Sequence, residues 1–188
     1  MAPLLQVKDI KTYYGNICAL KGISFEVSDG EIVCLIGSNG AGKTTTLKSI
    51  TGLLHPQEGS ILFNGEDILT FDEKRLRDYR GRQASMIFQD PMTSLNPVQT
   101  VEQHLVEAVE VHEGQTQSAD IVRRIKTLME RLGIMQSRLA SYPHQLSGGM
   151  RQRVMISLGL VLNAGLIIAD EATTSLDVIV EAKLVDQL

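Results

Sequence analysis

The stretch LIGSNGAGKTTTL, residues 35–47, constrains this chain most strongly, because it places three glycines and a lysine between an apolar run and a run of threonines. Glycine adopts backbone dihedral angles closed to other residues, so successive N–H groups of such a stretch can converge on one ligand. The stretch fits the pattern G-x-x-x-x-G-K-[ST] between a strand-like run and a predicted helix, which is the context that the pattern requires. It therefore predicts a loop that wraps a polyphosphate at a helix N-terminus. The alternative is a flexible turn with a surface lysine.

Within this loop, residue type predicts role. Lys43 is expected to bridge the β- and γ-phosphates, and the Thr44 hydroxyl is expected to bind Mg²⁺, a hard cation that prefers oxygen ligands. The residues expected to contact the nucleotide are Gly37, Ser38, Asn39, Gly40, Ala41, Gly42, Lys43, Thr44 and Thr45. A phosphate loop alone predicts nucleotide binding and does not say what the nucleotide is used for.

Composition sets the remaining limits. A chain of 188 residues that is 43% hydrophobic and 21% charged can bury one sizeable core. Its net charge of -4 includes no basic block, so we expect no nucleic-acid partner. The longest apolar stretch, residues 154–170, is interrupted by Asn163 and falls short of the roughly 20 apolar residues that a spanning helix needs. With no signal peptide visible, we expect a cytosolic protein whose Cys18 and Cys34 are buried free thiols.

The order of the predicted elements indicates an α/β chain. Strand-like runs occupy residues 4–10, 22–27, 31–36 and 60–65, and one helix begins at Gly42. Apolar spacing predicts further helices over residues 119–132 and after residue 149, while the unbroken apolar run at 164–169 predicts a buried parallel strand. Residues 89–118, with two prolines and a polar end, are expected to be the least structured.

Two adjacent acids follow the last apolar run. A buried parallel strand would deliver Asp170 to its carboxyl end, where ligands of open α/β sheets gather. Asp170 is then expected to hold Mg²⁺ through water, and Glu171 to polarise the attacking water. The alternative is an ordinary strand end with two solvated charges.

A second glycine motif, LSGGMRQRV at residues 146–154, resembles the signature motif of ATP-binding cassette (ABC) ATPases. Ser147 can cap a helix, while Gly148 and Gly149 leave its first amides open to an anion. The alternative is a capped helix start with a Gly-Gly turn. In the family that it resembles, this motif closes over a nucleotide held by the phosphate loop of a second subunit, which implies a head-to-tail homodimer or heterodimer.

The resemblance implies roles for four more residues. Tyr14 resembles the aromatic residue that stacks on adenine, and Gln89 resembles the glutamine that touches Mg²⁺ and the water. Asp177 resembles the loop that contacts the other subunit and its nucleotide. His144 looks like a structural part of the linker before the signature. The catalytic residues implied are Glu171, Gln89 and Lys43, and the metal ligands implied are Thr44, Gln89 and Asp170.

The chain resembles two subgroups of these ATPases. Residues 1–67 resemble the ATPases of branched-chain amino-acid importers. From about residue 68, segments such as MIFQDPMTSLNP and SYPHQLSGGMRQRVMI resemble those of oligopeptide, dipeptide and nickel importers. Ala172 stands where the family usually has proline after the catalytic glutamate, and we expect Glu171 to keep its role.

The resemblance implies a P-loop NTPase fold of the RecA-like type, with a parallel-sheet core, an N-terminal antiparallel β-subdomain and an inserted α-helical subdomain at about residues 90–160. Residues 1–188 are expected to form one nucleotide-binding domain. The family's switch histidine has no counterpart before Leu188, so we expect a truncated domain with incomplete C-terminal strands and weak or absent hydrolysis.

The function implied is that of an ATP-binding and ATP-hydrolysing subunit of a peptide or nickel importer. Such a subunit lies at the cytoplasmic face of the plasma membrane and binds separate transmembrane permease subunits. The alternatives are a soluble ABC ATPase outside transport and a nucleotide-binding fragment that does not hydrolyse.

Overall fold

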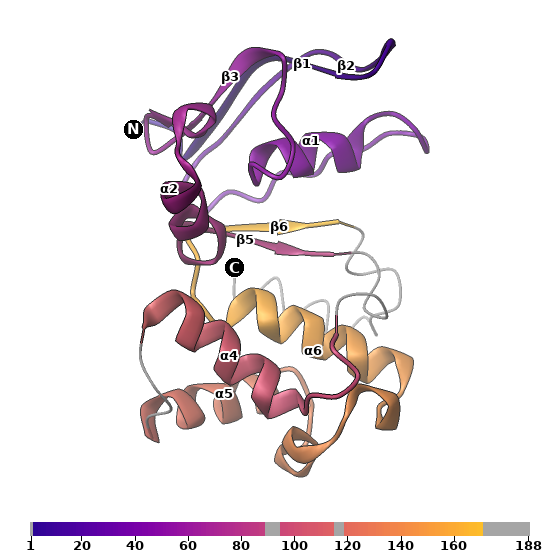
Figure 1. Ribbon diagram of the computed structural model, residues 1–188, viewed down its shortest axis with the longest axis vertical. Coiled ribbons are helices and arrows are strands. Elements are labelled where there is room, and N and C mark those ends of the chain that lie inside the picture. Colours follow the sequence, from indigo (N-terminus) through magenta and orange to yellow (C-terminus); the bar gives the residue numbers. More distant parts are fainter. Residues whose placement is uncertain (1, 89–94, 115–118, 171–188) are drawn as a thin grey trace. The chain divides into compact units, whose positions relative to one another are not determined.

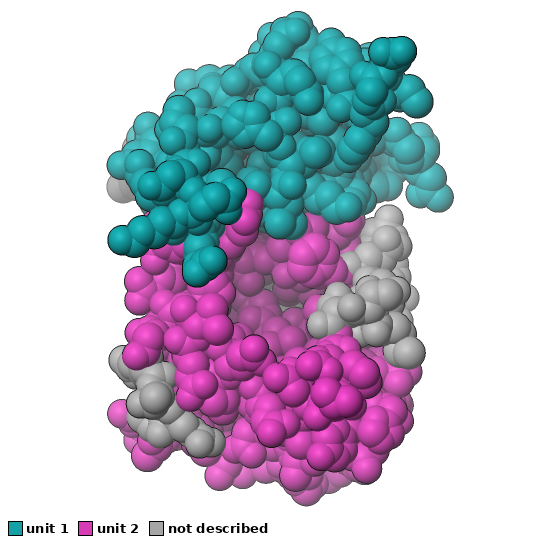
Figure 2. All heavy atoms as spheres, viewed as in Figure 1, with its two compact units in different colours: residues 1–77 teal, residues 78–188 magenta. Residues whose placement is uncertain are grey.

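The computed structural model describes residues 2–88, 95–114 and 119–170 of the chain. The chain divides into two compact units, residues 1–77 and residues 78–188 (Figure 2). Both contain strands and helices, as the predicted α/β class requires. The extent of a single nucleotide-binding domain over residues 1–188 stays a prediction.

The first unit is built on an antiparallel sheet in the order β2-β1-β3-β4 (Figure 1). Its strands are β1 (Leu5–Tyr14), β2 (Ile17–Val27), β3 (Glu58–Phe63) and β4 (Glu66–Asp67). Leu5 and Val7 of β1 alternate with polar side chains and are buried, and a register shift between Val7 and Ile10 accompanies the break in this alternation that leaves Ile10 buried as well. The predicted N-terminal antiparallel subdomain is thus confirmed.

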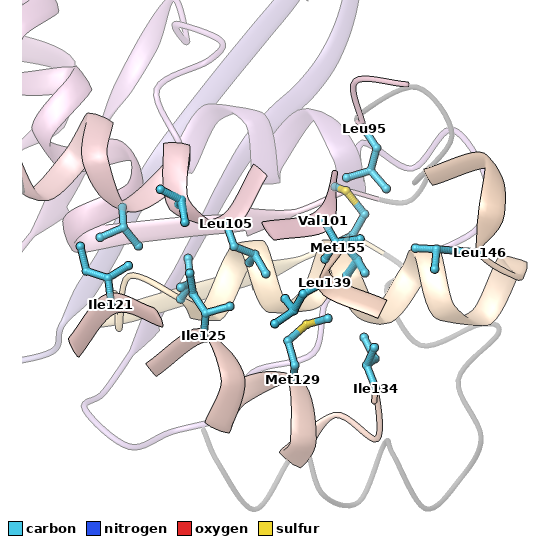
Figure 3. Close-up of a cluster of buried hydrophobic side chains, with 14 residues drawn as sticks. Leu95, Val101, Leu105, Ile121, Ile125, Met129, Ile134, Leu139, Leu146 and Met155 are labelled. Carbon is cyan, nitrogen blue, oxygen red and sulfur yellow. The ribbon is translucent and has the colours of Figure 1, made fainter. Parts of the chain in front are cut away.

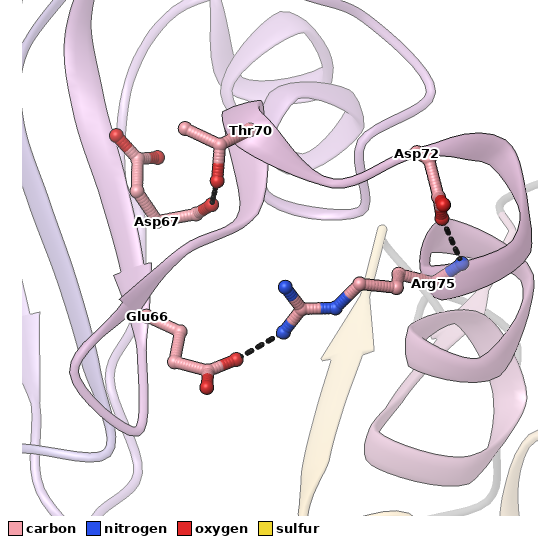
Figure 4. A network of polar contacts seen from close by, with 5 residues as sticks. All are labelled: Glu66, Asp67, Thr70, Asp72 and Arg75. Atoms are coloured by element: carbon pink, nitrogen blue, oxygen red, sulfur yellow. Dashed lines mark hydrogen bonds and ion pairs between the residues drawn. The ribbon is translucent and has the colours of Figure 1, made fainter.

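One helix of this unit, α1 (Lys43–Ile50), contacts β2. Beyond β4 follow the short helices η1 (Ile68–Thr70) and α2 (Glu73–Asp78). Polar contacts hold this stretch together (Figure 4): Arg75 forms an ion pair with Glu66, and its backbone N–H donates to Asp72 Oδ1 at 2.8 Å. The Arg75 guanidinium also lies 3.9 Å from the centre of the Phe71 ring, a cation–π contact.

The prediction of a strand over residues 31–36 is wrong for the described structure. No strand is assigned there, and Ile32, Val33 and Ile36 are 59%, 39% and 94% exposed. A strand needs a neighbour to pair its N–H and C=O groups, and none of the described residues pairs with this run.

The prediction of two buried thiols is also wrong. Both cysteines are free, but Cys34 is exposed and Cys18 is only half-buried. The Cys18 thiol donates to the Leu20 carbonyl oxygen at 3.2 Å.

The second unit begins with a kinked helical segment, η2 (Tyr79–Gln83), which leads into β5 (Ala84–Ile87). β5 pairs in parallel with β6 (Leu166–Ala169), as predicted for the run before Asp170. Leu166 and Ile168 are buried, whereas Ala169 is exposed, so burial on both faces does not extend to the end of this strand.

Three helices make the core of this unit: α4 (Val101–Glu113), α5 (Ala119–Arg131) and α6 (Gly148–Leu160). The short helices η3 (Gln136–Ala140) and η4 (Pro143–Gln145) connect α5 to α6. Figure 3 shows their shared apolar cluster, which includes Leu105 of α4, Met129 of α5 and Met155 of α6. An ion pair of 2.7 Å between Glu113 and Arg124 joins α4 to α5.

The expectation that residues 89–118 are the least structured is wrong for residues 101–113, which form α4. This helix starts with a capping box, in which the Thr100 side chain and the Gln103 side chain each accept from the other residue's backbone N–H. Val101, Leu105 and Val109 recur at a spacing of four and are at most 1% exposed. In the described part of the chain, no helix is both long and apolar enough to cross a membrane.

Candidate functional site

The loop at residues 37–43 is closed by two hydrogen bonds. The Lys43 ammonium donates to the Gly37 carbonyl oxygen at 2.6 Å, and the Ala41 backbone N–H donates to the Ser38 carbonyl oxygen at 3.1 Å. All loop residues from Gly37 to Ala41 are exposed. The Lys43 side chain therefore folds back along the exposed loop and reaches Gly37 at its start.

Gly42 gives this loop its shape. It caps α1 with φ 89 and ψ 10, the left-handed region that favours glycine. A Cβ at this position would lie 2.6 Å from Leu20 Cδ2 and 3.0 Å from the Ala19 carbonyl oxygen. Only glycine thus fits both the dihedral angles and the space against β2.

The start of α1 suits an anion. Gly42 has no side chain to cap the helix, and the first turn of α1, which is fully described, carries no acidic residue. The first amides of a helix have no acceptor within the helix and carry its partial positive charge. Together with Lys43, they form a positive site built from backbone and one side chain.

The three threonines of α1 separate into two roles. Thr46 is buried, and its hydroxyl donates to the Gly42 carbonyl oxygen at 2.9 Å, so it supports the loop. Thr44 is exposed at the helix start, and Thr45 is half-buried beside it. The exposed position leaves the Thr44 hydroxyl as the oxygen donor that could reach a cation bound to phosphate.

Tyr14 lies at the end of β1, where the hairpin turns to β2, and its side chain is 51% exposed. An exposed ring at a hairpin end offers a face to a planar group. It belongs to the same unit as the loop.

The second unit carries Asp170 at the carboxyl end of β6. The residue is 7% exposed, and its backbone N–H donates to the Ile87 carbonyl oxygen at 3.0 Å. The parallel β5 ends at Ile87, two residues before Gln89. Gln89, Glu171 and Asp177 lie outside the described residues.

The second glycine motif begins α6 as predicted. Ser147 caps this helix, and its hydroxyl accepts from the Met150 backbone N–H at 3.3 Å. A Cβ built at Gly148 or Gly149 would meet none of the described atoms within 4 Å, so these two positions are not packed against the described part of the chain. The fully described first turn of α6 has no acidic residue either.

His144, interpreted as structural, lies in η4 just before this motif. Its ring stacks on that of Tyr142, with the centroids 5.6 Å apart and the planes 11° from parallel. This contact is consistent with a structural role.

The first unit therefore carries Tyr14 and the residues from Gly37 to Thr45, and the second carries Asp170 and the motif at residues 147–149. Sequence reasoning missed His104, a buried residue of α4 whose ring contacts the backbone of residues 96 and 100. The capping box TVEQ at residues 100–103 was the signal for the helix that carries it.

Comparison with known proteins gives a consistent result. The model of the ABC transporter family matches residues 20–174. The chain is 40% identical to the oligopeptide transport ATP-binding protein OppD of Bacillus subtilis strain 168, over 97% of this chain and 54% of that protein. It is 44% identical to the peptidoglycan transport ATP-binding protein YejF of Agrobacterium fabrum, over 99% of this chain and 36% of that protein. The chain thus spans about half the length, or less, of these relatives.

A solved dimer of an ATP-binding cassette in a post-hydrolysis state, bound to ADP and Pi, has the same fold. Its TM-score is 0.86 at 26% identity, and the match covers 96% of this chain and 79% of that one. The OppD alignment covers most of residues 1–67 as well, the part whose motifs resemble branched-chain importers. With its P-loop NTPase fold and a family model that matches residues 20–174, the chain belongs to the ABC transporter family.

Proposed function

We propose that this chain binds ATP and is the ATP-hydrolysing part of a peptide importer. The observation that carries the proposal is the closed loop at residues 37–43, with its lysine folded over it and the uncapped start of α1 beside it. Glycine-shaped backbone and a helix N-terminus bind phosphate oxygens. The loop backbone, the start of α1 and the lysine together fit a triphosphate, which carries several charges, better than a singly charged anion.

Each proposed residue has a physical task. The amides of Gly40 to Thr45 and the Lys43 ammonium hold the phosphates, while Tyr14 stacks on the base. Thr44 and Asp170, a hydroxyl and a carboxylate, are the hard oxygen donors that suit Mg²⁺, and Gln89 completes this set. When bound, Mg²⁺ neutralises charge on the phosphate oxygens. Glu171 orients the attacking water, and the loop amides stabilise the charge that spreads over the transferred group.

The second anion site completes the proposed mechanism. Ser147 caps α6, and Gly148 and Gly149 are not packed against the described part of the chain, so a second subunit can bring this helix start to the nucleotide bound at residues 37–45. The γ-phosphate then favours the closed dimer, and its hydrolysis removes that preference. Opening and closing of the dimer would drive permease subunits at the cytoplasmic face of the plasma membrane.

Peptides are the proposed cargo class. Two of the relatives are named for oligopeptide transport and dipeptide transport, the second being DppD of Escherichia coli K12 at 41% identity. Nickel stays a second candidate on the sequence motifs alone. Vesicles that hold the chain with its permease subunits would separate the two: uptake of labelled peptide supports the proposal, and uptake of nickel alone contradicts it.

Nucleotide binding tests the basis of the proposal. In titrations with a fluorescent ATP analogue, Lys43→Ala should raise Kd about 10- to 100-fold, the effect of losing hydrogen bonds to charged groups. Lys48→Ala is the matched control, because Lys48 is an exposed lysine in the last turn of the same helix. Equal affinity for the wild type and the Lys43 variant would contradict the proposal.

A further inference from the structure

Two Asn–Gly pairs lie on exposed turns of the first unit, and they carry a chemistry that the proposed function does not use. They are Asn39–Gly40, in the loop at residues 37–43, and Asn64–Gly65, between β3 and β4. In an Asn–Gly pair, the backbone nitrogen of the glycine can attack the side-chain amide of the asparagine, because glycine has no side chain to shield that nitrogen. The two pairs allow a comparison within one molecule.

Asn64 is held firmly in its turn. Its φ is 49 and that of Gly65 is 83, in a two-residue turn whose flanking residues Phe63 and Glu66 pair with each other. The Asn64 backbone N–H also donates to the Leu4 carbonyl oxygen at 2.9 Å. In left-handed backbone the nitrogen of the next residue lies on the far side of Cα from the side chain. The Gly65 nitrogen can therefore reach the Asn64 amide only if this turn is broken.

Asn39 is held by much less. Its turn is closed by one hydrogen bond, from the Ala41 N–H to the Ser38 carbonyl oxygen at 3.1 Å, and its φ is not left-handed. The Gly40 N–H makes no hydrogen bond within the described part of the chain. A Cβ built at Gly40 would also meet none of the described atoms within 4 Å. The Gly40 nitrogen is thus unbonded and accessible, and rotation within one exposed turn brings it to the Asn39 amide.

We propose that Asn39 is a deamidation site, at which the nucleotide-free loop modifies itself. The Gly40 nitrogen forms a bond to Asn39 Cγ and gives up its proton, while the Cγ–Nδ2 bond breaks and Nδ2 takes up a proton and leaves as ammonia. Water then opens the resulting five-membered imide at either carbonyl carbon, which gives aspartate or isoaspartate. Each product carries a negative carboxylate where the amide was neutral.

The new charge acts on the phosphate site. This consequence rests on the proposed function, in which the loop amides from Gly40 onward hold the phosphates of ATP. A carboxylate on the neighbouring residue repels these phosphates, so Asn39→Asp should raise Kd for ATP about 10- to 100-fold. Bound ATP should in turn protect Asn39, because a phosphate oxygen that accepts from the Gly40 N–H withdraws this nitrogen from the reaction.

Peptide mass spectrometry on the whole chain, incubated at mildly alkaline pH, measures both pairs in one sample. Without nucleotide, conversion should be about five times faster at Asn39 than at Asn64, the effect of about one hydrogen bond. An ATP analogue at about ten times its Kd should slow conversion at Asn39 about tenfold, because only the free loop reacts, and should leave Asn64 unchanged. Conversion at Asn39 that is no faster than at Asn64, or that ignores bound analogue, would overturn the proposal.

Asn39→Gln links this chemistry to binding. A glutamine would have to close a larger ring, so it should stay unmodified, and binding by this variant at a fixed analogue concentration should keep its starting value during incubation. Binding by the wild type should fall in step with the converted fraction. Loss of binding without conversion, or an equal loss in the Gln variant, would overturn the proposal. If fresh protein binds no analogue, the proposed function fails, while the two conversion rates without nucleotide still judge the deamidation site.

Discussion

Gly159 of α6 lies so close to Ile87 of β5 that a Cβ on the glycine would come within 2.6 Å of Ile87 Cγ1. The helix thus packs on the strand that leads toward Gln89, and a hydrogen atom is the largest substituent that this contact accepts. Gly159→Ala should therefore lower the free energy of unfolding, because overpacking of about 1–3 kcal/mol should outweigh the gain in helix propensity of about 1 kcal/mol.

Whether Gly159→Ala raises or lowers the free energy of unfolding should depend on the side chain at residue 87. In an Ile87→Ala background the clashing atom is gone, so Gly159→Ala should raise the free energy of unfolding by about 1 kcal/mol, the propensity gain alone. Urea denaturation of the four proteins of this cycle measures the coupling. If Gly159→Ala has the same effect in both backgrounds, the close packing of α6 on β5 is contradicted.

Gly42→Ala should destabilise the protein and weaken ATP binding together. The new Cβ would meet Leu20 and force a left-handed dihedral angle on alanine, at a combined cost of about 2–5 kcal/mol. Gly65→Ala is the matched control, because Gly65 has φ 83 with none of the described atoms within 4 Å of its Cβ. It should cost only about 1 kcal/mol. Equal effects of the two variants in thermal unfolding would rule out the contact with Leu20.

Thr100→Ala removes one half of the capping box of α4 and should lower the free energy of unfolding by about 1 kcal/mol. Thr127→Ala, an exposed threonine inside α5, is the matched control and should be neutral or slightly stabilising, because alanine is the better helix former. Denaturant unfolding checks both variants. A loss of stability in the control as large as that in Thr100→Ala would show that capping is not the cause.

Stability should fall in mild acid because of His112. This ring packs over Gly81, and burial, with the nearby positive Arg82, lowers the pKa of His112 below its ordinary 6.5, although Asp78 partly opposes the shift. Below pH 6.5 the unfolded chain therefore binds a proton that the folded chain takes up only at lower pH. The free energy of unfolding should drop as the pH falls through this window. His112→Gln should flatten that slope, and an unchanged slope would contradict the account.

Much of the candidate site could be predicted from sequence, because its residues act through local backbone geometry. The glycines of the loop, the cap at Ser147 and the strand before Asp170 each depend on their immediate neighbours. The described residues form α1 directly after the loop, α6 directly after Ser147 and β6 directly before Asp170. The pairing of strands and the burial of side chains could not be predicted in the same way. The run at residues 31–36 has the composition of a strand, but a strand also requires a partner at its edge.

Helix α4 and the contacts of His104 were not predicted either. The apolar face of α4 is interrupted by polar residues, so the prolines before it favoured an unstructured segment over a helix, although the capping box of α4 was present in the sequence. His104 carries no motif, and its significance comes from its contact with Asn96 across the turn. Such contacts appear only once the chain is folded.

Cross-linking between copies tests the central claim, that the loop of one subunit and the α6 start of another bind one ATP. Both native cysteines are replaced by serine, Glu171→Gln is present throughout to hold the nucleotide, and Ser38→Cys proteins are mixed with Ser147→Cys proteins and a short bis-maleimide. Proteins with Thr127→Cys in place of Ser147→Cys are the control. We predict a mixed cross-linked dimer that forms with ATP and not without it. A mixed dimer that is absent, that ignores ATP, or that forms equally with the Thr127→Cys control would contradict the claim.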